Sequence, residues 1–202
     1  MADLTQLKAD VDFMKSLAVD GSRVPFNGGW PLLLAGAIFG GAALIHYFIQ
    51  VAGAGPDSLT LWGGAMLLYA VCCLGWGLKS RASFRAQGSK NRVAATAWSG
   101  IGFSIFLLSV VQAIVSLRMQ APFPGAFMMP MVLVLYGLGW LITAETSSQR
   151  WMSWVGIGCF VMTPLMAWLS FRPEQLLIYA AALVCSALIP GWILLVQARA
   201  SQ

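Results

Sequence analysis

Six long stretches of the chain contain no Asp, Glu, Lys or Arg, and this feature limits the possible folds more than any other. Each stretch has about the 20 residues that an α-helix needs to cross roughly 30 Å of hydrocarbon. One charge at the centre of such a helix would cost about 2.5–3.5 kcal/mol on insertion scales, so its absence from every stretch is informative. The stretches are residues 30–50, 59–78, 93–117, 125–144, 151–171 and 176–196.

The composition supports a membrane protein. Charged residues make up 9% of the chain and hydrophobic residues 59%, whereas about a quarter of an average soluble domain is charged. The apolar stretches do not alternate in polarity, as the strands of a transmembrane barrel would. The sequence therefore predicts an all-α integral membrane protein with six transmembrane helices, in which a cytoplasmic segment (1–28), a transmembrane domain (29–197) and a short tail (198–202) follow one another.

The basic residues predict how the helices are oriented. Ten of the twelve Lys and Arg residues lie before the first stretch, after the sixth, or in the second and fourth connections. Loops rich in Lys and Arg stay in the cytoplasm during insertion. We therefore expect a multi-pass protein of the bacterial inner membrane, built as three tandem hairpins with both termini cytoplasmic. The first stretch is expected to be a retained helix, because it begins after nearly thirty residues and no signal-peptide cleavage site follows a short core.

The second connection is the most basic part of the chain. It holds five cations and no acidic residue: Lys79, Arg81, Arg85, Lys90 and Arg92. Such a loop favours contact with anionic lipid headgroups, although fixing the topology explains the same charges. Nucleic-acid binding is not expected, because aromatic side chains that could stack on bases are not interleaved with the cations.

Tryptophan and glycine recur together at the ends of the apolar stretches. Four Gly-Trp pairs and two copies of Trp-x-Gly-Ile-Gly, at 98–102 and 154–158, suggest a repeated hairpin. Tryptophan favours the interface because its ring prefers hydrocarbon and its N–H prefers water. Small residues such as those of Gly36-x-x-x-Gly40 allow helices to approach closely. Six tryptophans are predicted to be anchors at the cytoplasmic interface: Trp30, Trp76, Trp98, Trp140, Trp154 and Trp192.

The N-terminal segment predicts an amphipathic helix. Its apolar residues repeat with alternating spacings of three and four and so share one face. Four Asp and two Lys occupy the other positions, which argues against adsorption to anionic lipid. The helix is expected to dock on protein, either on the chain's own cytoplasmic loops or on a separate partner. The apolar face consists of Leu4, Leu7, Val11, Met14 and Ala18.

A few polar residues within the apolar stretches form a candidate site. His46 is the only histidine, with Tyr47 and Gln50 close by, and Gln112 is expected at a similar depth. Intramembrane ionisable groups are functional candidates because their burial is costly. His46 would relay protons or bind haem or a metal, or it would be a neutral residue bonded to Gln112 or Tyr47. One histidine without other ligands at suitable spacing predicts neither a cofactor nor a metal site.

The remaining features bear on the class of function. Prolines 130, 164 and 190 are expected to interrupt three helices, either along a moving pathway or as static kinks. The chain has no nucleophile elbow, phosphate loop or paired intramembrane carboxylates, so we expect no catalytic residues and no enzyme activity. An accessory or scaffold subunit is the leading hypothesis. Its partners are expected to be membrane lipids together with another membrane protein, a cytoplasmic partner or a second copy of the chain.

The alternative hypothesis is a small secondary transporter or channel with a polar site near His46 and Gln112. The two hypotheses differ in the interior that they require. A core filled with Leu, Met, Phe and Trp favours the scaffold, and a wet polar cavity favours transport.

Overall fold

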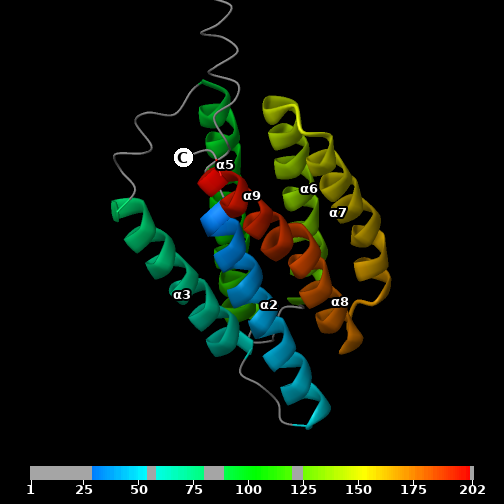
Figure 1. Ribbon diagram of the computed structural model, residues 1–202. Coiled ribbons are helices and arrows are strands. Elements are labelled where there is room, and N and C mark those ends of the chain that lie inside the picture. Colours follow the sequence, from blue (N-terminus) through cyan, green and yellow to red (C-terminus); the bar gives the residue numbers. More distant parts are fainter. Residues whose placement is uncertain (1–28, 54–57, 80–88, 120–124, 201–202) are drawn as a thin grey trace, which may run out of the picture.

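The computed structural model describes residues 29–53, 58–79, 89–119 and 125–200, and within these ranges every regular element is helical (Figure 1). Six helices are long and apolar enough to cross a membrane. The predicted class is confirmed, and the protein is a multi-pass membrane protein. The elements are α2 (Gly29–Val51), α3 (Ser58–Lys79), α5 (Ser89–Met119), the 3₁₀ turn η1 (Gly125–Phe127), α6 (Met128–Ser147), α7 (Arg150–Trp168), α8 (Glu174–Leu183), the π-helical segment η2 (Val184–Leu188) and α9 (Ile189–Ala200).

The first and last spans pack closely against each other through glycine. Figure 1 shows α2 between α3 on one side and the span formed by α8, η2 and α9 on the other. A Cβ on Gly29 would lie 2.7 Å from the carbonyl oxygen of Gly191, and one on Gly36 would lie 2.7 Å from the backbone nitrogen of Leu188. Neither position has room for a side chain. Two of the four Gly-Trp pairs, at 29–30 and 191–192, therefore meet at this crossing.

The other half of the core lies between α6, α7 and the last span. Because a transmembrane bundle buries its largest side chains where helices meet, the fully buried residues mark this contact. Among the largest of them are Trp140, Leu133, Met152, Met166 and Leu183.

The packing does not follow the order of three tandem hairpins. The two spans of each expected hairpin do contact each other, but the most extensive contacts join α6 to α7 and α2 to the last span. The two copies of Trp-x-Gly-Ile-Gly also differ in environment. Trp98 is half-buried and bonded to Thr143, whereas Trp154 is 72% exposed. The two copies of this motif therefore do not occupy equivalent positions in the fold.

Two helices lie at the edge of the bundle. In the most apolar part of α3 and of α5, 6% of the residues are buried, compared with 39% in α2 and 50% in the last span. The main neighbour of α3 is α2, and that of α5 is α6. Most of the surface of α3 and α5 is consequently not used for packing within the chain.

Candidate functional site

His46 lies near the end of α2 with both ring nitrogens engaged. The indole N–H of Trp62, on α3, donates to His46 Nδ1 at 3.0 Å. Gln50, one turn further along α2, places its amide nitrogen 3.2 Å from His46 Nε2. The histidine is 7% exposed. Trp62 also lies near the ring of Tyr179 from α8, with the two ring centroids 6.3 Å apart.

These contacts fix the protonation state that the site accommodates. An indole N–H can only donate, so His46 Nδ1 must accept and cannot carry a proton. The ring proton of a neutral His46 is then on Nε2, and Gln50 accepts it through its amide oxygen. This assignment exchanges the oxygen and nitrogen of the Gln50 amide, which have nearly the same shape. His46 is therefore a neutral imidazole with a defined tautomer.

The candidate polar residues do not all gather around His46. His46 and Gln50 are brought together, and Tyr47 directs its ring at Phe48, with centroids 5.4 Å apart. Gln112 lies beside the start of η1, where its Nε2 is 3.3 Å from the position of a Cβ on Gly125. The partners expected for His46 were Gln112 or Tyr47, and those that the structure gives it are Gln50 and Trp62.

Trp140 is not an interfacial anchor, which corrects the sequence prediction for this residue. Its side chain has no exposed surface, and its indole N–H donates to the carbonyl oxygen of Ser186 at 2.7 Å. In a regular α-helix that carbonyl would accept from the residue four positions later. Here that residue is Pro190, which has no N–H. Trp140 supplies a donor from α6 to this carbonyl, which lies within the π-helical segment.

Gln175, on the last span, donates a similar hydrogen bond to a carbonyl that lies before α6. Its amide donates at 2.8 Å to the carbonyl oxygen of Ala126, and the residue four positions after Ala126 is Pro130. A second contact from the same amide reaches the carbonyl oxygen of Met166 at 3.2 Å. The last span thus satisfies a carbonyl before α6, while α6 satisfies one in the last span. Neither carbonyl is therefore left as an unpaired polar group that could line a pathway.

The three prolines lie differently in their helices. Pro164 lies inside α7, which continues to Trp168, and Pro190 follows the π-helical segment. Pro130 does not interrupt a helix, because it is the third residue of α6. Proline is tolerated in a first turn, where its N–H has no partner within the helix.

The other predicted anchors fall into two groups. Trp98 belongs to an aromatic cluster, where its ring lies edge-on to both Tyr136 and Trp140 and its N–H donates to Thr143 at 2.8 Å. Trp76 is half-buried, while Trp30, Trp154 and Trp192 are exposed, as an interfacial anchor requires. The aromatic cluster accounts for Trp98 and Trp140 by packing and hydrogen bonding within the chain.

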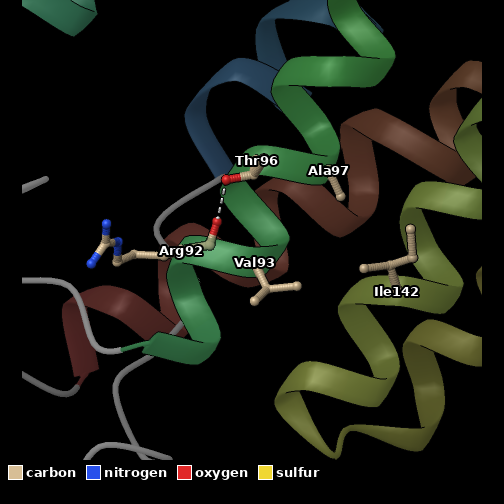
Figure 2. A pocket seen from close by; sticks show the side chains of 5 residues that line it. All are labelled: Arg92, Val93, Thr96, Ala97 and Ile142. Carbon is tan, nitrogen blue, oxygen red and sulfur yellow. Dashed lines mark hydrogen bonds between the residues drawn. The ribbon is translucent and has the colours of Figure 1, made fainter.

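A shallow pocket of about 420 Å³ lies between the start of α5 and the end of α6, lined by Arg92, Val93, Thr96, Ala97 and Ile142. Figure 2 shows Val93 and Ile142 facing the gap between the helices, whereas the guanidinium of Arg92 extends away from it. The Thr96 hydroxyl donates to the carbonyl oxygen of Arg92 at 2.8 Å. The charged group of Arg92 and the apolar side chains that line the pocket therefore point in different directions.

Several predicted residues fall outside the part of the chain that the structure describes. They are the whole N-terminal face of Leu4, Leu7, Val11, Met14 and Ala18, and Arg81 and Arg85 of the basic connection. Lys79 ends α3, and Lys90 lies in the first turn of α5. The predictions for the N-terminal helix and for the basic loop remain predictions.

Neither Trp62 nor Gln175 was identified from the sequence as part of a polar site. A signal for Trp62 exists in the register of the hairpin, because residues 39 and 46 face residues 69 and 62 on the antiparallel neighbour. Within the described ranges, no group of three His, Cys, Asp or Glu residues is placed to hold a metal ion.

The comparisons with known proteins give no relative. No family model, curated protein or solved structure matches the chain. The function is therefore inferred from the physical features of the fold.

Proposed function

We propose that this protein is a non-enzymatic accessory or scaffold subunit of the bacterial inner membrane, which binds another membrane polypeptide through the outer faces of α3 and α5. The observation that carries the proposal is the difference between these two helices and the rest. Both are long enough to span the membrane, yet 6% of their most apolar part is buried. A second polypeptide seated there would complete the burial of these helices.

The glycines support this choice of surface. On α2, α6, α7 and α9, six of the nine glycines lie where a Cβ would meet a neighbouring helix, as at Gly36, Gly137 and Gly191, and the other three are open. On α3 and α5, a Cβ would meet nothing within 4 Å at any glycine. Lipid does not need small residues, whereas helix–helix contacts in membranes are enriched in them. The open glycines of α3 and α5 are Gly63, Gly64, Gly75, Gly77, Gly100 and Gly102.

The serine hydroxyl groups on α5 are also compatible with a surface that binds a neighbouring helix. Ser99, Ser104 and Ser109 each donate to the backbone carbonyl four residues earlier, at 2.8–2.9 Å. Their hydrogen bonds are therefore satisfied within α5, and their small size leaves room for a neighbouring helix. A scaffold surface of this kind needs shape and not charge.

The interior favours the scaffold over the transporter. The fully buried side chains include Trp140, Met152 and Met166, and His46 is enclosed by Trp62 and Gln50. A transporter needs a polar site that solute and water can reach. The two polar residues that would have formed it, His46 and Gln112, make separate contacts.

Photocrosslinking tests the proposed surface directly. A photoreactive amino acid replaces Leu67 on α3, which is 67% exposed, and in a matched control it replaces Val161 on α7, which is 65% exposed. The protein is irradiated in native membranes. We expect a discrete polypeptide adduct from position 67 and lipid adducts alone from position 161. A doubled chain mass identifies a second copy, and any other discrete mass identifies a different subunit.

Two outcomes contradict the proposal. Lipid adducts alone at position 67, together with the same result at Phe103 on α5, mean that the surface faces the bilayer. Equal polypeptide adducts at positions 67 and 161 mean that contact is unselective.

A further inference from the structure

The α2–α3 hairpin is held by two aromatic contacts seven residues apart. Phe39 meets Tyr69 with ring centroids 5.4 Å apart, and His46 meets Trp62 at 6.1 Å with the rings nearly perpendicular. The second contact also carries the hydrogen bond from the Trp62 indole to His46 Nδ1. Because α2 is the main neighbour of α3, these contacts set where α3 lies.

The hydrogen bond and a second proton on His46 exclude each other. Nδ1 is the only ring nitrogen with a free lone pair in the neutral tautomer assigned above, and the Trp62 N–H occupies it. A proton arriving at Nδ1 turns this atom into a donor, so two N–H groups would face each other at 3.0 Å. Protonation therefore requires the indole to move away.

We propose that His46 and Trp62 form an acid-sensitive latch between α2 and α3. At neutral pH the indole N–H is bonded to His46 Nδ1 and α3 is held against α2. When His46 binds a second proton, the indole leaves Nδ1, and α3 is released at the end of the hairpin where α2 ends. The latch operates whichever polypeptide or lipid covers the outer face of α3.

Among the groups around His46, the histidine itself is the one that gains a charge when the pH falls. On α2 its neighbours are Gln50 and Tyr47. On α3 it faces Trp62, whose indole is also near Tyr179 of α8. Tyr47 and Tyr179 are the ionisable side chains among these groups, and a phenol has no basic site that mild acid would protonate. Glu174 and Arg172, the charged residues at the start of α8, are exposed.

The single histidine makes the test specific. The full-length protein is labelled with ¹⁵N at histidine and tryptophan side chains and studied by NMR in lipid nanodiscs as the pH is lowered. Both histidine signals belong to His46, and the indole signal of Trp62 is the one lost in Trp62→Phe. We expect the proton on Nε2 at neutral pH, then protonation of Nδ1 with a shift of the Trp62 signal over the same pH range.

Two variants keep the proposal falsifiable. His46→Asn places an amide oxygen near the position of Nδ1 but does not titrate, so its Trp62 signal should not change with pH. Trp62→Phe removes the competing donor, so His46 should bind its second proton at a higher pH than in the wild type. The proposal is overturned by a neutral-pH proton on Nδ1, by a Trp62 signal that stays fixed while His46 titrates, or by an unchanged midpoint in Trp62→Phe.

Discussion

Single side chains in this protein complete hydrogen bonds that proline leaves open. Trp140 and Ser186 are 46 positions apart, and their 2.7 Å bond lies in the fully buried core. A buried carbonyl without a donor costs about 1–3 kcal/mol, so the position of Pro190 creates a need that the indole meets. The same reasoning explains why Gln175, a polar residue, is almost completely buried.

Trp140→Phe should therefore lower the free energy of unfolding by about 1–3 kcal/mol beyond the loss of ring volume, because it removes the donor to Ser186. Reversible unfolding in mixed detergent micelles measures the change. Pro190→Ala restores a backbone N–H, so the double variant should recover part of the loss. Strict additivity of the two substitutions would show that the indole and the proline do not act on one carbonyl.

At the scale of elements, glycine decides how closely α2 meets the last span. A Cβ on Gly36 would lie 2.7 Å from the backbone nitrogen of Leu188, whereas one on Gly41 would meet nothing within 4 Å. Backbone atoms cannot turn aside as a flexible side chain can. The two positions are five residues apart on one helix, so they form a matched pair.

Gly36→Ala should lower the free energy of unfolding by about 1–3 kcal/mol, as expected for overpacking, because α2 must move away from the last span. Gly41→Ala should have no such effect, and the gain in helix propensity makes it neutral or slightly stabilising. Unfolding of both variants under the same conditions gives the comparison. An equal loss in both would mean that the crossing is not close at Gly36.

At the scale of the whole molecule, the six-helix class follows from the apolar stretches because the length of a membrane helix is set by the bilayer. The partners of each helix do not follow, because adjacent hairpins and long-range pairs bury similar apolar surfaces. Trp140 illustrates the difference. Its place beside Gly139 at the end of a stretch predicts an interface, and only the three-dimensional contact with Ser186 places it in the core.

The candidate site was predictable only in part, because contacts within one helix follow from sequence spacing and contacts between helices do not. Gln50 is one helical turn from His46, so their contact follows from spacing alone. Trp62 comes from the next helix, and its contact depends on the register of the hairpin. Gln112 was matched to His46 by depth alone, which does not determine how a helix is rotated about its axis.

Even numbers of spans place both ends of the bundle on one side, and Gly29 of α2 indeed packs against Gly191 of α9. The excess of Lys and Arg predicts that this side is the cytoplasm. Single cysteines at Ser148 and Glu174, which are both exposed, in a chain without native cysteines, should react with an impermeant maleimide from opposite sides of the membrane. Labelling of Ser148→Cys in intact cells would mean that the orientation is reversed.

The mass of the assembly in its native lipid tests the account most directly. The protein is extracted with its surrounding bilayer by a polymer, and its stoichiometry is determined by native mass spectrometry. We predict a mass above that of one 21.7 kDa chain, reduced to one chain by Gly63→Leu on α3 and unchanged by Gly158→Leu on α7, two glycines that are both open. A wild-type protein that is always released as a single chain with lipid would contradict the account.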